Sequence, residues 1–331
     1  MIGEGWETVH NLLPATGVAI ITDNNVFSLY GKKFPVFPVF SVDPGEESKK
    51  IGIVESLAGK LISAGIDRSG FILAIGGGVV SDIAGFLASI YLRGIRFGSV
   101  STSLLSQVDA STGGKNGVNL GKFKNILGTF KQPEFVICDP EMLKTLSDEE
   151  YFSGLAELVK TAIIGDVKLF ELIEDNTIKI LNRQSEFMAS LIKLAVDFKA
   201  SVVTEDEKEA GVRRILNFGH TYGHAIELYG SFRHGYAVAS GMQLATLFSE
   251  EKGYIKADDR RRITDLLNKF SLLRMHDIPD HLISDFIVHD KKKAGDGIYF
   301  VFTGGPGKAF TEKIAVDDVT EFYRRSKIRQ L

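Results

Sequence analysis

The first 145 residues alternate short, nearly continuous apolar runs with segments of helical periodicity. Apolar runs of this length without polar alternation are typical of strands that are covered on both faces. We expect such strands at Val18–Thr22, Val36–Val42, Phe71–Ile75, Ile95–Ser101 and Phe135–Cys138. Between them, apolar residues three and four apart predict helices over Glu46–Ala64 and Val79–Tyr91. The alternation predicts an α/β fold with a doubly wound, mostly parallel sheet and ligands at the carboxyl ends of its strands.

The pattern changes after Leu146. Ser147 and Glu150 predict a capping box, and mostly helical patterns follow it, at Tyr151–Ile164, Glu186–Val203 and Arg260–Phe270. Two apolar runs near the end, Ile298–Phe302 and Phe310–Val316, flank a glycine-rich turn and predict a β-hairpin. We therefore expect an α/β domain over residues 1–146 and a mainly helical domain with a late hairpin over 147–331.

Composition narrows the class of protein. Of 331 residues, 44% are hydrophobic and 24% charged, which excludes a disordered chain, and the formal net charge of −3 offers no basic field for nucleic acid or an anionic membrane. The N-terminus is acidic and no apolar run approaches the ~20 residues of a membrane span, so we expect a cytoplasmic protein. The single cysteine, Cys138, ends an apolar run and is expected to be a small buried side chain.

The segment FILAIGGGVVSDIAGF, residues 71–86, predicts a strand, a triple-glycine turn and a helix. Gly76, Gly77 and Gly78 would let a pyrophosphate approach the backbone, and the helix start offers free N–H groups; Asp82 falls in its first turn. The spacing is neither GxGxxG nor a P-loop, so a turn that needs glycine only for packing is an equal alternative.

A second polar, glycine-rich segment, residues 106–125, carries charged and amide side chains: Asp109, Lys115, Asn119, Lys124 and Asn125. This composition suits a charged, hydroxylated ligand, although a solvated surface loop is the commoner explanation of such a stretch taken alone. Its position after a strand favours a site.

Histidines cluster in the segment RRILNFGHTYGHAIE and in SFRHGYAVASGM, which follows it. His220 and His224 are four apart, so on a helix both rings project from one face, as in many metal sites, and His234 follows. Glu157 lies in an apolar helical stretch, where a carboxylate is costly without a cation. The alternative is a set of core or capping histidines. Nearby, Gly219 and Gly223 indicate a close backbone approach.

Several cations recur among apolar positions: Lys160, three residues after Glu157, and Lys199, Arg213 and Lys291–Lys293. Together with a metal and a nucleotide, they would suit a small, multiply anionic substrate such as a phosphorylated acid. A solvated basic face is the alternative, and it is strongest for Lys291–Lys293.

These segments together resemble the 3-dehydroquinate synthase family, one of the sugar phosphate cyclases. The resemblance runs from about Val18 to Lys313 and rests on GGGVVSDIAGFLASIYLRG, LLSQVDASTGGKNGVN with Lys124-Asn125, GLAELVK, and LNFGHTYGHAIE followed by HGYAVASGM.

The resemblance implies an N-terminal NAD-binding domain and a helical domain whose Glu157, His220 and His234 hold a divalent metal, usually zinc and in some cases cobalt. It implies catalytic or substrate-binding roles for Asp109, Lys115, Asn125, Lys160, Lys199, Arg213, Asn217, His224 and Arg93, and we add Lys292 from the basic run. It implies NAD contacts at Asp23, Asn25, Glu46, Lys49, Gly77, Gly78, Asp82, Thr102, Ser103, Lys115, Lys124, Thr145, Leu146 and Glu150. Because the position of Arg93 reaches the neighbouring subunit's site in the family, we expect a homodimer.

The reaction that the resemblance implies converts 3-deoxy-D-arabino-heptulosonate 7-phosphate into 3-dehydroquinate and phosphate in the shikimate pathway. It proceeds by transient NAD-dependent oxidation, phosphate elimination, reduction and intramolecular aldol closure. The alternatives are a cyclase for another sugar phosphate, a metal- and NAD-dependent polyol dehydrogenase, and a non-catalytic binding module. Polyol dehydrogenases usually lack the GGKxGVN segment, present here as Gly113 to Asn119.

The sequence departs from the family at four places. Ser101 stands where proline is usual, Asn116 replaces threonine, Tyr236 replaces glutamate, and DEKE at 206–209 replaces DERE. None of these positions is one of the three expected metal ligands, and Tyr236 is the departure most able to alter the choice of substrate.

Overall fold

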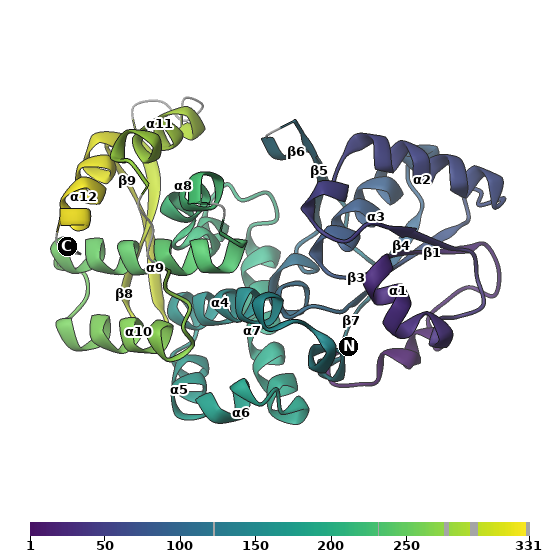
Figure 1. Ribbon diagram of the computed structural model, residues 1–331, viewed down its shortest axis with the longest axis horizontal. Helices are drawn as coiled ribbons and strands as arrows, with labels where there is room; N and C mark the ends of the chain where they lie inside the picture. Colours follow the sequence, from purple (N-terminus) through teal and green to yellow (C-terminus); the bar gives the residue numbers. More distant parts are fainter. Residues whose placement is uncertain (122, 231, 275–277, 292–296, 329–331) are drawn as a thin grey trace. The chain divides into compact units, whose positions relative to one another are not determined.

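The computed structural model describes residues 1–121, 123–230, 232–274, 278–291 and 297–328. Contacts between residues divide the chain into two compact units (Figure 1). The first unit consists of Met1–Tyr151 with Arg183–Val196, and the second of Phe152–Asn182 with Asp197–Leu331. In this division a helical stretch from the middle of the sequence belongs with the N-terminal unit.

The first unit is built on a five-stranded parallel sheet, as the alternating pattern predicts. The strands are β1 (Val18–Asp23), β2 (Val39–Val42), β3 (Phe71–Gly76), β4 (Arg96–Ser101) and β7 (Val136–Cys138), in the order β2-β1-β3-β4-β7. The strand order changes direction between β1 and β3. In sheets of this kind ligands bind at such a switch point, outside the carboxyl ends of the strands.

Both faces of this sheet are covered, which explains the absence of polar alternation. Along β1, Ala19 and Ile21 pack into one core with α2 (Ile51–Ser63) and α3 (Gly78–Ile90). Val18 and Ile20 point the other way, into a core that contains Trp6. Figure 1 shows α2 and α3 on one side of the sheet and α1 (Asn24–Tyr30) on the other.

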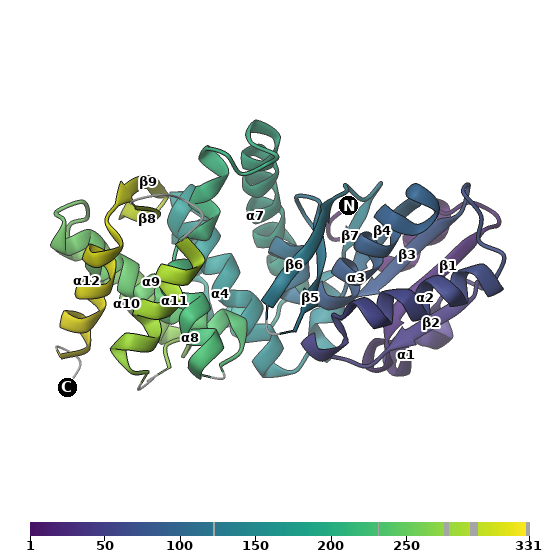
Figure 2. The same ribbon diagram turned by 90° about the horizontal axis from the view of Figure 1, so that it is seen from above.

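Two expectations for the first unit are wrong in detail. The helix predicted over Glu46–Ala64 is a 3-10 turn, Glu46–Ser48, followed by α2, because the backbone at Lys50 is extended. The polar segment predicted as a loop forms a π-helical turn, Ser106–Ala110, and then a separate antiparallel hairpin of β5 (Lys115–Leu120) and β6 (Phe123–Phe130), which lies beside α3 (Figure 2).

The remaining short elements of this unit are 3-10 turns at Trp6–Asn11, Gly31–Lys33, Tyr91–Arg93 and Pro140–Thr145. Ser147 caps α4, as predicted, since its Oγ accepts a bond from the Glu150 N–H at 3.4 Å.

Helices dominate the second unit, as expected, and the late hairpin is present. The helices are α4 (Asp148–Gly165, which begins in the first unit), α5 (Val167–Asp175), α6 (Thr177–Leu181), α7 (Ser185–Glu205, which also spans the division), α8 (His220–Gly230), α9 (His234–Glu251), α10 (Ala257–Lys269), α11 (Asp280–Lys291) and α12 (Val316–Ile328). A 3-10 turn, Val212–Asn217, precedes α8, and β8 (Ile298–Gly305) pairs with β9 (Lys308–Ile314). Among the described residues, we find no helix with the length and apolar character needed to span a membrane.

Candidate active site

Three side chains from three helices of the second unit converge: Glu157 of α4, His220 of α8 and His234 of α9. One potential ligand atom from each lies within 4.8 Å of the others. Oε1 of Glu157 is 3.3 Å from Nε2 of His234 and 3.7 Å from Nε2 of His220. One carboxylate and two imidazoles are a ligand set typical of catalytic zinc sites.

Glycines bring these three helices together. A Cβ at Gly241 of α9 would lie 2.0 Å from the carbonyl oxygen of Gly219, and one at Gly223 of α8 would lie 3.0 Å from the Cα of Val238. On the other side, a Cβ at Gly235 would lie 2.1 Å from the carbonyl oxygen of Ser153 in α4. The close approach predicted from Gly219 and Gly223 is therefore confirmed, and the neighbour is α9.

The carboxylate of Glu157 is fully buried, and Lys160, one turn later on α4, forms an ion pair with it. Burial alone would raise the pKa of Glu157. The charge of Lys160 and the contacts with the two imidazoles lower it by more, so that the pKa lies well below its usual range. Neither carboxylate oxygen makes a well-aligned hydrogen bond within the described part of the chain. A buried anion with this need for positive charge fits a bound cation.

The two histidines differ in what their other ring nitrogen contacts. Nδ1 of His220 lies 3.1 Å from the carbonyl oxygen of Phe218, whereas Nδ1 of His234 lies 3.2 Å from Oε2 of Glu227. Burial and the positive charge of Lys160 lower the pKa of His220 to about 3. Burial also opposes protonation of His234, but its contacts with the carboxylates of Glu157 and Glu227 raise its pKa to about 10.

His224 completes a group of three rings. It follows His220 by one turn of α8, as predicted, and its ring centroid is 5.1 Å from that of His220 and 6.3 Å from that of His234. Its side chain is exposed, unlike Glu157. His224 can therefore reach a molecule that binds in front of the cluster.

The turn Val212–Asn217 carries two further predicted residues of the second unit. Arg213 is 2% exposed and donates through Nη1 to the carbonyl oxygen of Glu207, and Asn217 donates through Nδ2 to the carboxylate of Glu209. Lys199 of α7 is buried as well. Lys292 lies outside the described residues.

In the first unit, five of the predicted nucleotide residues gather at the carboxyl ends of the strands. They are Asp23, which is the last residue of β1, Gly77 and Gly78 after β3, and Thr102 and Ser103 after β4. A Cβ at Gly77 would lie 3.1 Å from Oγ of Ser103, so the turn after β3 is tightly packed. Both explanations of the triple glycine are therefore compatible, because the same turn exposes the first N–H groups of α3.

Other predicted nucleotide residues are tied to one another. The ammonium of Lys49, whose side chain is buried, forms an ion pair with Asp82 of α3. Nδ2 of Asn119 donates to Oε1 of Glu46 at 2.9 Å, and the Asn119 N–H donates to the carbonyl oxygen of Lys49 at 2.7 Å. These bonds fasten the β5–β6 hairpin to the turn that precedes α2.

The remaining predicted residues of this unit lie on several elements. Thr145 shares a hydrogen bond of 2.6 Å with the hydroxyl of Tyr30. Asn25 lies in α1, Leu146 follows the 3-10 turn Pro140–Thr145, and Glu150 lies in the first turn of α4. Asp109 lies in the π-helical turn, and Arg93 ends the 3-10 turn after α3. Lys115 and Lys124 are exposed on the hairpin, and Asn125 has a positive φ of 52°.

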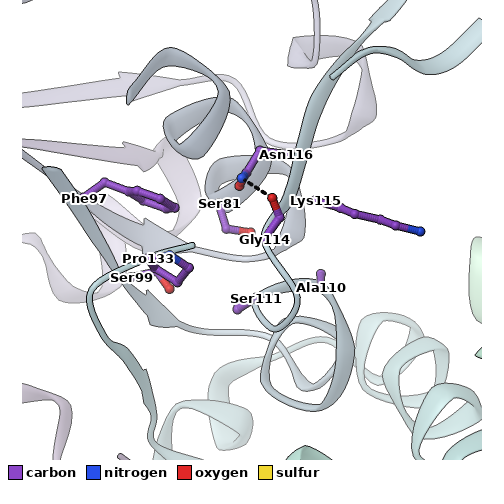
Figure 3. A pocket seen from close by; sticks show the side chains of 9 residues that line it. All are labelled: Ser81, Phe97, Ser99, Ala110, Ser111, Gly114, Lys115, Asn116 and Pro133. Carbon is purple, nitrogen blue, oxygen red and sulfur yellow. Dashed lines mark hydrogen bonds between the residues drawn. The ribbon is translucent and has the colours of Figure 1, made fainter. Parts of the chain in front are cut away.

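A cavity of about 10 Å³ lies beside β5, large enough for about one water molecule and far too small for a nucleotide. Its lining residues, shown in Figure 3, are Ser81, Phe97, Ser99, Ala110, Ser111, Gly114, Lys115, Asn116 and Pro133. The side chain of Lys115 extends away from it (Figure 3). Asn116 has a structural role here, since Nδ2 donates to the carbonyl oxygens of Gly114 and Lys131.

Solved structures share this architecture. A 2-epi-5-epi-valiolone synthase from Streptomyces hygroscopicus, solved with NAD+ and Zn2+, superposes with a TM-score of 0.91 over 99% of this chain and 96% of its own, at 25% identity. A 2-deoxy-scyllo-inosose synthase complexed with carbaglucose-6-phosphate, NAD+ and Co2+ superposes with a TM-score of 0.84 over 98% of this chain and 95% of its own, at 27% identity. The fold is thus that of the sugar phosphate cyclases.

Sequence comparison identifies the particular family. Residues 39–153 match the profile of the 3-dehydroquinate synthase N-terminal domain, and residues 154–293 match that of its C-terminal domain. A 3-dehydroquinate synthase from Geotalea uraniireducens is 42% identical over 90% of this chain and 83% of its own length. The chain belongs to the 3-dehydroquinate synthase family.

Proposed function

We propose that this protein converts 3-deoxy-D-arabino-heptulosonate 7-phosphate into 3-dehydroquinate and phosphate, with NAD+ and a divalent metal, zinc or cobalt, as cofactors. The observation that carries the proposal is the cluster of the buried Glu157 with the half-buried His220 and His234, and with Lys160 beside it. A chain of this family that keeps a complete metal-ligand set and an adjacent cation has the groups that the reaction needs.

The metal would be held by Oε1 of Glu157 and the Nε2 atoms of His220 and His234, the atoms that face one another. When bound, zinc supplies a Lewis acid for a substrate oxygen, and NAD+ takes up a hydride and returns it, so that no net redox occurs. Lys160 balances the remaining charge of the Glu157 carboxylate and places an ammonium next to the same site. This ammonium can bind an anionic oxygen of the substrate.

Cations and amides of the second unit would bind the substrate. Arg213 is buried, and Nη1 of its guanidinium donates to the carbonyl oxygen of Glu207. This bond holds the planar guanidinium in one orientation, in which its other N–H groups would bind a phosphate or carboxylate. Lys199 and Asn217 would contribute a further charge and an amide. His224, which is exposed beside the cluster, is suited to move a proton to or from a substrate oxygen. Asp109, Lys115 and Asn125 of the first unit remain predicted substrate residues.

The carboxyl edge of the parallel sheet would bind NAD. The first N–H groups of α3 and the absence of side chains at Gly77 and Gly78 suit a pyrophosphate. The ion pair between Lys49 and Asp82 holds the turn before α2 against α3. Asp23 caps α1 by accepting from the N–H groups of Asn25 and Val26, which fixes its carboxylate beside the end of β1.

We further propose that the chain forms a homodimer in which Arg93 serves the neighbouring subunit. Arg93 lies between the end of α3 and the start of β4, at the amino edge of the sheet, whereas the predicted NAD residues such as Gly77 lie at the carboxyl edge. A role for Arg93 in its own subunit's NAD site is therefore disfavoured. A cytoplasmic location remains the prediction from the sequence.

The test is phosphate release from 3-deoxy-D-arabino-heptulosonate 7-phosphate with zinc and a catalytic amount of NAD+, while NADH absorbance is followed. We expect phosphate and 3-dehydroquinate to appear without accumulation of NADH. Release of phosphate from another sugar phosphate alone would reassign the substrate. Steady formation of NADH from glycerol-like polyols would instead indicate a dehydrogenase, and tight binding of NAD and zinc without any turnover would indicate a binding module.

A further inference from the structure

Glu227 contacts one of the three clustered metal-site residues without belonging to the set. Its Oε2 lies 3.2 Å from Nδ1 of His234, the ring nitrogen that points away from Glu157. The side chain of Glu227 is 13% exposed, so this contact is partly shielded from water.

The position of Glu227 on α8 explains how it reaches this nitrogen. It follows His220 by seven residues and His224 by three, so all three side chains project from one face of the same helix. The α8 helix packs against α9 through Gly223 at backbone distance, which brings the face with Glu227 close to the first turn of α9, where His234 lies. One face of α8 thus carries the candidate metal ligand His220 and, through Glu227, contacts the candidate ligand His234 of α9.

We propose that Glu227 is a positioning residue that holds the His234 ring with its proton on Nδ1 and its Nε2 lone pair directed at the metal. The proposal rests on the metal site proposed above. A carboxylate that accepts a hydrogen bond from the far nitrogen of a ligating imidazole fixes its tautomer and orientation and increases its basicity. Nδ1 of His220 instead faces the neutral carbonyl oxygen of Phe218. Of the two histidines, His234 is therefore the one whose Nδ1 contacts a carboxylate.

The experiment compares metal affinity in Glu227→Ala, Glu227→Gln and the control Leu228→Ala, without substrate. Leu228 is the next residue on α8 and is 48% exposed, so its truncation tests the effect of altering the helix alone. Affinity is measured by competition between the protein and a chelator for Zn2+ and Co2+. The visible spectrum of the Co2+ protein reports the ligand geometry, and the 15N shifts of His234 report which nitrogen carries the proton.

We expect Glu227→Ala to bind metal roughly 10- to 100-fold more weakly than the wild type and to change the Co2+ spectrum. Glu227→Gln keeps an oxygen that can accept the Nδ1 bond, so it should recover a large part of the affinity, and Leu228→Ala should match the wild type. In the wild-type zinc protein the proton should be on Nδ1 of His234.

Wild-type affinity in Glu227→Ala would overturn the proposal, as would a proton on Nε2 of His234 in the zinc protein. The second measurement uses the wild type, so it holds even if the alanine variant does not fold. A wild type that binds zinc but releases no phosphate would refute the proposed reaction and leave this inference standing.

Discussion

The backbone of Gly235 lies directly against that of Ser153: a Cβ at Gly235 would be 2.1 Å from the carbonyl oxygen of Ser153, and the Gly235 N–H donates to its Oγ at 3.0 Å. Glu157 lies one turn after Ser153 on α4, and His234 directly precedes Gly235 on α9. The contact therefore sets the distance between the carboxylate and one imidazole of the candidate metal site.

Replacement of Gly235 by alanine should disrupt this site, because the new methyl group meets rigid backbone and α9 must shift. We expect the free energy of unfolding to fall by about 1–3 kcal/mol or more and the metal content to fall with it. Urea unfolding and metal analysis measure both. Gly59→Ala is the control, since nothing lies within 4 Å of its added Cβ and alanine in a helix should stabilise by about 0.5–1 kcal/mol. A Gly235→Ala protein with wild-type stability and metal content would contradict this account.

The sheet of the first unit could be predicted from the sequence because its strands are buried on both faces and stand out as apolar runs. The β5–β6 hairpin could not. Its strands pair with each other outside the main sheet, and β6 is largely exposed, so no apolar run marks it. At its centre Gly117 opposes Gly128, and a Cβ at Gly117 would lie 2.8 Å from the carbonyl oxygen of Leu127. Glycine there serves close pairing, whereas the composition indicated a loop.

Ser101 shares a hydrogen bond of 2.6 Å with the hydroxyl of Ser111, and both are buried. This bond closes the segment that contains Asp109. Ser101→Ala leaves the buried hydroxyl of Ser111 without this partner, so we expect a loss of about 1–3 kcal/mol of stability and a raised KM for the phosphorylated substrate. Thermal unfolding and steady-state kinetics test this.

The control for this substitution is Ser190→Ala on an exposed face of α7, which should change stability by no more than about 0.5 kcal/mol. Equal stability of the Ser101 and Ser190 variants would show that the Ser101–Ser111 bond contributes nothing.

Asp206 organises the turn that leads to Arg213. Its carboxylate accepts N–H bonds from Ala210 at 2.9 Å, Gly211 at 2.7 Å and Arg213 at 3.0 Å. Desolvation raises the pKa of Asp206, but these bonds outweigh it and lower the pKa below its usual value. A carboxyl group with a lowered folded-state pKa stabilises the turn above the unfolded-state pKa, about 4, and this stabilisation is lost as the pH falls through the folded value.

The amide NMR signals of these three residues should therefore titrate together with a midpoint below about pH 4. Asp206→Asn should remove the titration and weaken binding of anionic substrate while the overall fold is kept. A common midpoint at or above the ordinary aspartate value would contradict the lowered pKa.

Cys138 lies at the end of β7 and is 2% exposed, as the apolar run predicted. Burial raises the pKa of its thiol to about 12, so almost no reactive thiolate exists at pH 8. We expect the native protein to resist alkylation by iodoacetamide and the protein in concentrated denaturant to react with one equivalent per chain, measured by mass spectrometry. Complete labelling of the native protein within the time that the denatured protein needs would contradict this expectation.

Much of the candidate site could also be predicted from the sequence, because helical spacing relates His220 to His224 and Glu157 to Lys160. The role of Glu227 could not, although it lies in the same motif. Its partner His234 lies on another helix, and the packing of α8 against α9, with glycines at the contact, brings the two side chains together. Contacts that depend on the packing of two helices leave no periodic signal in either one.

The last prediction separates holding the metal from using it. His220→Ala removes one of three ligand atoms, so metal and activity should be lost together. Lys160→Ala leaves the three ligands in place, and a bound dication compensates the buried charge of Glu157, so metal should remain while turnover falls. Metal analysis of both purified variants tests this, with His10→Ala and Lys168→Ala as exposed controls that should keep both. A His220→Ala protein with full zinc content would refute the ligand assignment, and a Lys160→Ala protein with normal turnover would show that its ammonium serves only to neutralise Glu157.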